Sequence, residues 1–118
     1  MNTIDYLAGT DTVHIATERE DGGEVRTPIW AVVVDGVPYI RSGYGDGSKW
    51  YRRVQRTGRA VFVEGSERYP VTVENLDDDS VIGKVDQAYR AKYARQAAAL
   101  DQVVAPEVRE YTMRITPQ

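Results

Sequence analysis

Alternation between β-branched and other residues indicates that much of this chain forms short β-strands. The clearest example is residues 12–17, where three β-branched residues occupy every second position and would share one face. Asp35 and Gly36 predict a two-residue hairpin turn, because they separate two apolar runs and tolerate positive φ. Pro28 cannot donate to a sheet ladder, so it marks an edge or a bulge. The predicted strands span residues 12–17, 25–34, 37–42, 59–64, 69–74 and 109–115.

Two stretches follow the helical period instead. A short helix is expected to begin near Lys49, because Trp50 and Val54 lie one turn apart. A longer helix is expected to begin after the three acids at 77–79, which favour the positive end of the helix dipole. Its apolar positions recur at steps of three and four as far as Leu100.

These elements predict an α+β chain built around an antiparallel sheet. A closed or nearly closed barrel is favoured, because closure removes the unpaired edges of a sheet. The 118 residues contain no repeat, low-complexity tract or linker, so we expect a single domain over residues 1–118. A chain of this length can bury one core without disulfides.

The composition excludes several kinds of chemistry. With no cysteine, the chain has no thiolate nucleophile, iron–sulfur cluster or cysteine zinc site. His14 is the single histidine, and on its predicted strand we expect it to be packed or hydrogen-bonded rather than catalytic. The acids at 77–79 are explained by helix capping, and no metal site is expected. With no long apolar run and no signal peptide, we expect a cytoplasmic protein.

Positive charge is concentrated in one segment of an otherwise acidic chain. The formal net charge is −3, from 15 Lys and Arg against 18 Asp and Glu. Residues 49–59 hold five cations and no acid, so the remainder carries 10 cations, 18 acids and a charge of −8. A local cluster favours an anion site over general binding to nucleic acid or to membranes, and we expect neither of these partners. The five cations are Lys49, Arg52, Arg53, Arg56 and Arg59.

The segment before these cations has the features of a phosphate site. Gly43, Gly45 and Gly47 would let backbone N–H groups approach an anion closely. A helix amino terminus at Ser48 and Lys49 would add partial positive charge at the same point. A plain turn followed by a solvated helix would also explain these residues, so both interpretations stay open.

Four motifs give the sequence a resemblance to a known family. They are Arg-Thr-Pro-Ile-Trp (26–30), Tyr-Ile-Arg-Ser (39–42), Asp-Gly-Ser-Lys-Trp-Tyr-Arg (46–52) and Ala-Tyr-Arg-Ala-Lys-Tyr (88–93). Over residues 12–116 the chain resembles an uncharacterised family, a domain of unknown function, within the FMN-binding split-barrel superfamily. That superfamily includes pyridoxamine phosphate oxidases and deazaflavin-dependent nitroreductases. The resemblance implies a six-stranded antiparallel split β-barrel with a short helix after strand 3 and a longer helix before the last strand.

The resemblance also implies a site for FMN or a deazaflavin coenzyme. The phosphate side would comprise Arg41, Ser42, Gly43, Tyr44, Gly45, Ser48, Lys49 and Trp50, and the ring side Arg26, Thr27, Pro28 and Ile29. Ser42-Gly43 stands where the deazaflavin branch commonly has Ser-Lys, and Arg53 stands where it has Asn. Lys49, Arg52 or Arg53 would then replace the charge of the missing lysine.

The implied function is hydride transfer by an oxidoreductase on an unidentified small organic substrate. Relatives of this fold hold the cofactor between two subunits, so the resemblance implies a homodimer. The two departures motivate an alternative, a cofactor-free split-barrel domain that acts as a binding or interaction module. A further alternative is a non-redox enzyme that uses the same pocket, with His14, Tyr44 or Glu64 as acid or base.

Overall fold

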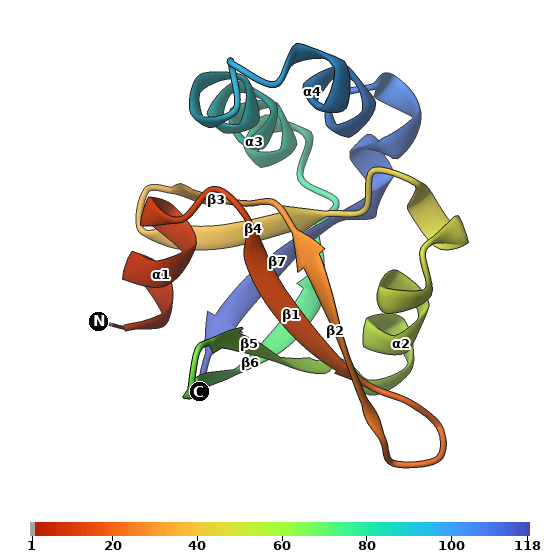
Figure 1. Cartoon of the computed structure of the whole chain (residues 1–118). Coiled ribbons are helices and arrows are strands. Elements are labelled where there is room, and N and C mark those ends of the chain that lie inside the picture. The colour runs from red at the N-terminus through yellow and green to blue at the C-terminus, as the bar shows by residue number, and fades with distance from the viewer. Residues whose placement is uncertain (1) are drawn as a thin grey trace.

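Seven antiparallel strands form one curled sheet in the computed structural model of the protein, which describes residues 2–118 (Figure 1). The strand order across the sheet is β2-β1-β5-β6-β7-β4-β3. Asp35 and Gly36 join β3 to β4 with φ values of 51° and 80°, which confirms the predicted hairpin turn. The strands are β1 (Val13–Glu18), β2 (Glu24–Ile29), β3 (Ala31–Val34), β4 (Val37–Arg41), β5 (Arg59–Glu64), β6 (Glu67–Asn75) and β7 (Thr112–Pro117).

The two edges of this sheet meet at Trp30. β2 and β3 are separated in the chain by this one residue, yet they lie at opposite ends of the strand order. The sheet must therefore curl until its edges come together, which makes it a barrel that is split at this corner. The expected α+β split-barrel fold is confirmed. Pro28 lies on the edge strand β2, where its missing N–H leaves no gap in a ladder.

The strand predicted over residues 25–34 is wrong, because the structure divides it into β2 and β3. Seven strands therefore replace the six expected. The Trp30 ring stacks on the Tyr93 ring with centroids 3.9 Å apart, and this packing fixes the corner between the two strands. The last strand begins three residues later than predicted, because the 3₁₀-helix η2 (Pro106–Tyr111) precedes it.

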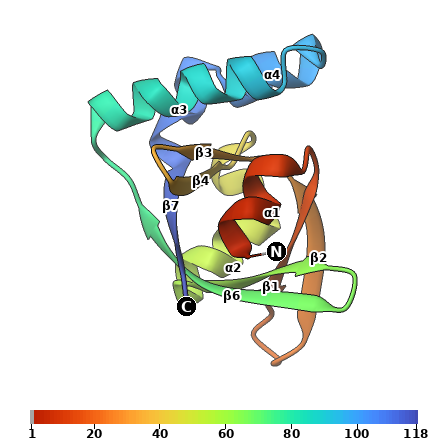
Figure 2. The same cartoon turned by 90° about the vertical axis from the view of Figure 1, so that its left-hand side faces the viewer.

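The helices cover the barrel on three sides (Figures 1 and 2). α3 and α4 form a layer over β3 and β4, while α1 packs on the same strands from the other side. α2 fills the end of the barrel beside β1 and β5. The helices are α1 (Thr3–Gly9), α2 (Lys49–Thr57), α3 (Asp79–Lys92) and α4 (Ala97–Val103), with the 3₁₀-helix η1 (Gly45–Gly47) before α2.

The long helix predicted as far as Leu100 is wrong in its extent. The carboxylate of Asp78 caps α3, accepting from the N–H groups of Ser80 and Val81, which confirms the role expected for the acids at 77–79. The helix then ends at Lys92, followed by Tyr93 as its C-cap. The Tyr93 hydroxyl lies within hydrogen-bond distance of the Asp11 and Ala31 carbonyls outside the helix, and α4 begins four residues after Tyr93.

The first residues of the chain, which precede every strand and helix expected from the sequence, form α1. The Asn2 side chain caps this helix by accepting from the Asp5 N–H at 2.9 Å. Tyr6 and Leu7 are buried against the barrel.

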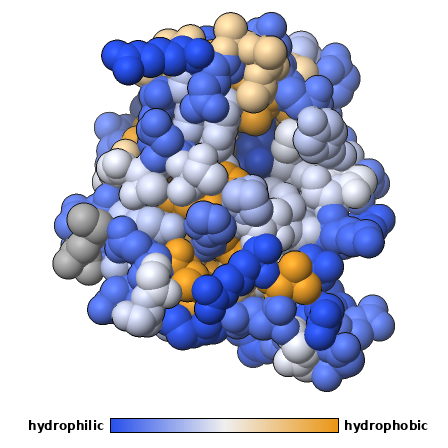
Figure 3. Space-filling view, in the orientation of Figure 1, coloured by the Kyte–Doolittle hydropathy of each residue, from blue (hydrophilic) through white to orange (hydrophobic). Residues whose placement is uncertain are grey.

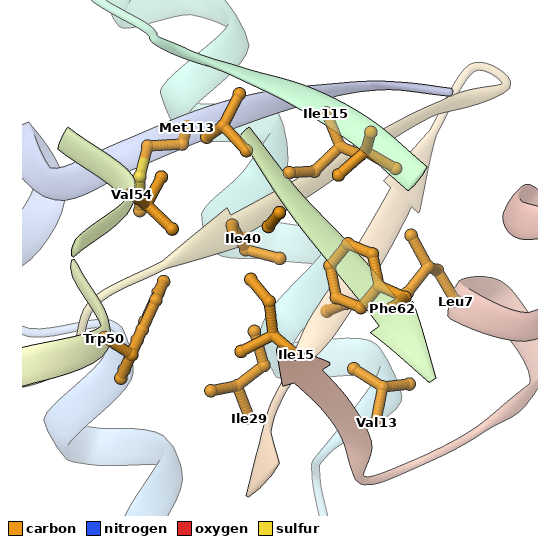
Figure 4. Packing of buried hydrophobic residues seen from close by; sticks show 14 of the residues in the cluster. Leu7, Val13, Ile15, Ile29, Ile40, Trp50, Val54, Phe62, Met113 and Ile115 are labelled. Carbon is orange, nitrogen blue, oxygen red and sulfur yellow. The ribbon is translucent and has the colours of Figure 1, made fainter. Parts of the chain in front are cut away.

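Two apolar clusters stabilise the fold. One fills the barrel and contains Leu7, Ile15, Ile40, Phe62 and Met113 among its members (Figure 4). The other lies between the outer face of β3 and β4 and the layer of α3 and α4. Its principal buried members are Val32, Tyr39, Val85, Tyr89, Tyr93, Leu100 and Val104. The two faces of β3 therefore belong to different cores, which is why its sequence is uniformly apolar.

Candidate functional site

A pocket of about 250 Å³ opens between the end of β2, the loop after β4 and the helix α4. Its wall combines two tryptophans, one tyrosine, one arginine and small residues. On this side of the molecule, residues of intermediate hydropathy gather between α4 and α2 (Figure 3). The lining residues are Pro28, Ile29, Trp30, Arg41, Gly43, Tyr44, Ser48, Trp50, Ala99, Gln102 and Val103.

This pocket brings together both halves of the site expected from the sequence. Pro28 and Ile29 come from the ring side, whereas Arg41, Gly43, Tyr44, Ser48 and Trp50 come from the phosphate side. The other expected residues lie outside the lining. They are Arg26, Thr27, Ser42, Gly45, Lys49 and Arg53. Arg26 and Lys49 are exposed, whereas Thr27 and Arg53 are half-buried.

Arg41 lines the pocket, but its guanidinium is held by the protein itself. The side chain is fully buried and paired with the carboxylate of Asp86. Its Nε donates to Thr112 Oγ1 at 2.8 Å and its Nη1 donates to the Val103 carbonyl at 3.1 Å. Arg41 therefore fastens β4 to α3 and to α4. Because Asp86 balances its charge, Arg41 adds little net positive charge to attract an anionic ligand.

Ser42 is also committed within the chain. Its hydroxyl is buried and donates to the Gly45 carbonyl at 2.7 Å, which holds the loop after β4 in shape. Gly45 has φ of 59°, and a Cβ at this position would lie 2.8 Å from Cε2 of Tyr111. Only glycine fits there, because both the backbone conformation and the close ring exclude a side chain.

Two tyrosines support the loop from beneath. The Tyr51 and Tyr111 rings meet edge-to-face with centroids 5.3 Å apart. Burial raises the pKa of the Tyr51 hydroxyl, and hydrogen bonding to Glu110 raises the pKa of the Tyr111 hydroxyl. Both rings are therefore neutral near pH 7 and act as packing groups rather than as bases.

The amino terminus of α2 faces the pocket. Among residues 2–118, no side chain caps the backbone N–H groups of its first turn. Ser48 is extended at the N-cap, and its hydroxyl makes no capping hydrogen bond. The first intrahelical N–H bond is that of Arg52, which donates to the Ser48 carbonyl at 3.2 Å. The N–H groups of the first turn and the helix dipole therefore provide positive potential at this end of the pocket. Lys49 is exposed beside them.

Four lining residues were not among the site residues expected from the sequence. Trp30 lies between β2 and β3, while Ala99, Gln102 and Val103 belong to α4 and form the wall opposite the loop. The Gln102 side chain donates to the Gly43 carbonyl and joins that wall to the loop. The position of Trp30 next to the expected ring side was the one available signal, since α4 reaches the pocket only through tertiary packing.

The remaining candidates lie away from the pocket. The His14 side chain is exposed on β1, so the expectation that it is packed is wrong; its backbone N–H donates to the Tyr6 hydroxyl. Glu64, at the end of β5, accepts from the Tyr69 hydroxyl at 3.2 Å. Arg56 donates to the Glu18 carbonyl. No group of three metal-ligating residues occurs within residues 2–118.

Comparisons with solved structures show the same fold with different chemistry. An F420-H₂ dependent reductase is 17% identical with a TM-score of 0.61, covering 91% of this chain and 93% of its own. A candidate pyridoxamine 5′-phosphate oxidase from Listeria innocua is 10% identical with a TM-score of 0.64, covering 98% and 90%. The heme storage protein HutZ of Vibrio cholerae is 12% identical with a TM-score of 0.63, covering 97% and 86%. These likenesses show the fold alone.

The sequence itself matches a family model over nearly its whole length. No curated protein matches the chain significantly. Among the helices of residues 2–118, none is long and apolar enough to cross a membrane. The family match covers residues 3–115, and the expected membership of an uncharacterised family with the split-barrel fold is confirmed. The chain belongs to DUF2255, a family described as uncharacterised proteins conserved in bacteria.

Proposed function

We propose that this protein binds FMN or a deazaflavin coenzyme in the 250 Å³ pocket and uses it as an oxidoreductase on a small organic substrate. The observation that carries the proposal is the composition of the pocket, which unites the end of β2 with the loop after β4 and the start of α2. An F420-H₂ dependent reductase and a candidate pyridoxamine 5′-phosphate oxidase share the fold, which supports this choice of ligand class.

The phosphate end of the coenzyme would lie at the start of α2. Ser48 offers a hydroxyl with no capping partner, and the first turn of the helix offers backbone N–H groups. Tyr44 and Ser48 both line the pocket at this end. Lys49 adds a nearby positive charge, which replaces that of Arg41 because Arg41 is already paired with Asp86. The donor set therefore suits a phosphate.

The ring end would lie between β2 and α4. Pro28, Ile29 and Trp30 present backbone and one aromatic ring, and Val103 and Ala99 present an apolar wall. This lining suits the face of a flat ring system. The bound coenzyme supplies the hydride chemistry, so the protein needs no catalytic dyad of its own. The residues position the ring and leave its reactive face accessible to a substrate.

We propose that the functional unit is a homodimer. A pocket of about 250 Å³ is slightly smaller than the roughly 300–1,000 Å³ of sites that enclose a drug-sized ligand. One chain would therefore cover the coenzyme incompletely. Tyr44 lines the pocket and is 76% exposed, and a second subunit would bury it. Location in the cytoplasm and the lack of nucleic-acid and membrane partners stay predictions.

Other ligands find less support in the pocket. Heme iron takes an axial His, Cys, Met or Tyr ligand, and among the lining residues only Tyr44 has such a side chain. The non-redox alternative relied on His14, Tyr44 or Glu64, and His14 and Glu64 lie outside the lining. A cofactor-free binding module remains the main alternative.

A fluorescence titration tests the proposal. We expect FMN or a deazaflavin, added to the purified protein at micromolar concentration, to lose fluorescence on binding. Replacing Lys49 and Arg53 together by Ala should weaken binding about ten-fold at low salt, because the phosphate loses nearby positive charge. Arg114→Ala is the matched control, since Arg114 is exposed on β7 and paired with Glu74.

The outcomes separate the alternatives. Saturable quenching by either coenzyme supports the proposal, and the tighter of the two identifies the ligand. No response to either coenzyme contradicts it and favours the cofactor-free module. Saturable binding of heme alone would assign the pocket to a different cofactor. Unchanged affinity in the double variant would remove Lys49 and Arg53 from the site.

A further inference from the structure

A second depression, of about 370 Å³, lies between α1 and α3 along the outer edge of β3. Figure 2 shows these two helices on either side of β3. It shares no lining residue with the coenzyme pocket. Its volume falls within the range of about 300–1,000 Å³ that is typical of small-molecule sites. The lining is apolar except for one amine, and consists of Ala8, Val32, Val33, Ala88, Ala91 and Lys92. We refer to it as the edge groove.

The amine of Lys92 has an unused donor in the edge groove. Its Nζ donates to the Leu7 and Ala31 carbonyls, both at 2.7 Å. An ammonium carries three N–H bonds, so one remains after these two contacts. Within residues 2–118 no carboxylate lies at ion-pair distance from it, in contrast to Lys84 on the same helix, which pairs with Asp35. A half-buried cation without an anion is costly, and an anionic ligand would relieve that cost.

The backbone of β3 offers a second donor at the same edge. β3 pairs only with β4, and in that pairing Val33 lies opposite Pro38, which has no N–H. Val33 is therefore at a non-hydrogen-bonded position, and its N–H points away from β4. The backbone groups of Ala31, two residues earlier, also point away from β4. Its N–H donates to the Tyr93 hydroxyl, and its carbonyl accepts from Lys92 Nζ and from the Tyr93 hydroxyl.

The surroundings of Lys92 favour binding of an anion on physical grounds. Burial lowers the pKa of Lys92 to about 8, and Asp11 opposes this shift. The Tyr93 ring lies 5.2 Å from Nζ, and burial raises the pKa of its hydroxyl to about 12, so it adds no charge. β3 contains no titratable residue, and the Tyr6 hydroxyl of α1 donates to the Val63 carbonyl. Lys92 is thus the one cation of the groove.

We propose that the edge groove binds a small carboxylate with an apolar tail. The carboxylate accepts from Lys92 Nζ and from the Val33 N–H, and the tail lies on the alanines of α1 and α3. One ammonium and one neutral N–H match a single negative charge. A phosphate dianion would leave charge unmatched among alanines and valines, and a neutral alcohol would leave the ammonium unpaired.

The test uses octanoate as the probe and the amide spectrum of the ¹⁵N-labelled protein as the readout. We expect saturable shifts at Val33 and at the residues of the groove. Lys92→Met should weaken binding at least ten-fold, whereas the control Lys84→Met should change it less than two-fold. Affinity should fall roughly thirty-fold from pH 6.5 to pH 9.5, because octanoate stays ionised while Lys92 loses its proton.

Two further measurements keep the proposal falsifiable if Lys92→Met is unstable. Ala91→Leu leaves the amine in place but fills the groove, so it should also weaken octanoate binding about ten-fold. Octanol should bind at least ten-fold more weakly than octanoate. Equal affinity of octanol and octanoate, equal affinity of Ala91→Leu and the wild type, or no shifts at millimolar octanoate would each overturn the proposal. None of these outcomes depends on coenzyme binding.

Discussion

At the scale of single residues, buried polar groups decide how the candidate site is built. Arg41 was expected to hold a phosphate, and it does face the pocket. Its nitrogens are nevertheless used by Asp86, Thr112 and the Val103 carbonyl. Asp86 also pairs with Arg109 through Nε and Oδ2 at 3.0 Å. One carboxylate thus joins β4, α3 and η2 behind the pocket.

Removal of this carboxylate should destabilise the protein. Asp86→Ala leaves the buried Arg41 guanidinium without its anion, and we expect the free energy of unfolding to fall by about 3 kcal/mol. Glu74→Ala is the control, because it breaks the exposed pair with Arg114 and should cost less than about 1 kcal/mol. Urea unfolding of the two variants measures both values. Similar losses of unfolding free energy in the two variants would show that the buried ion pair stabilises the protein no more than the exposed pair does.

The residue scale also shows where sequence reasoning stopped. The glycines and Ser48 were recognisable as a loop and helix start because their backbone preferences are local. The commitment of Arg41 to Asp86 was not recognisable, since these residues are 45 positions apart and meet only when α3 packs on β4. The sequence therefore identified residues of a type that can bind a phosphate. Whether each of them is free to do so depends on its tertiary partners.

At the scale of elements, local patterns predicted most strands and the start of both helices. α2 begins at Lys49, as expected, and it ends before Gly58, which adopts the left-handed conformation of a helix end. The errors lie where no local signal exists. A continuous apolar run hides the corner at Trp30, and an alanine-rich helical pattern hides the turn between α3 and α4. α1 spans only seven residues, which is too short a segment to establish a helical period.

The turn before α2 should be the element most sensitive to substitution. Gly45→Ala places a methyl group in contact with the Tyr111 ring and forces an alanine to adopt φ of 59°, so we expect a loss of about 2 kcal/mol. Gly47→Ala is the control, because a Cβ there meets no atom within 4 Å. Thermal unfolding compares them. A variant Gly45→Ala as stable as Gly47→Ala would show that the turn relaxes freely.

At the scale of the whole molecule, two of the depressions in the surface have separate linings. The 250 Å³ pocket lies at the corner where the sheet closes, and the edge groove lies on the outer edge of β3. Closure through Trp30 brings β2 against the loop after β4, although these segments are distant in the strand order. The site could therefore be assembled from the sequence only once the family resemblance supplied this topology.

The stability of the whole chain depends on pH, and Lys92 contributes a part that increases as the pH rises. Its pKa is lowered in the folded state to about 8, so the unfolded chain binds more protons above that pH. Stability should therefore rise from pH 8 to pH 10, and this rise should be smaller in Lys92→Met than in Lys84→Met. Above pH 10 the raised pKa values of the buried tyrosines reverse the trend, because the unfolded chain ionises first. Urea unfolding between pH 7 and pH 11 measures the difference, and identical profiles would contradict it.

The central claim is that the pocket at this corner holds a flavin-type coenzyme. The most direct measurement is the dissociation constant of the tighter-binding coenzyme in two variants of α4. Ala99 lines the pocket and Ala98 does not, while both are exposed. We predict that Ala99→Trp weakens binding at least ten-fold by filling the pocket, and that Ala98→Trp leaves it within two-fold of the wild type. Equal affinity in the two variants would contradict the claim.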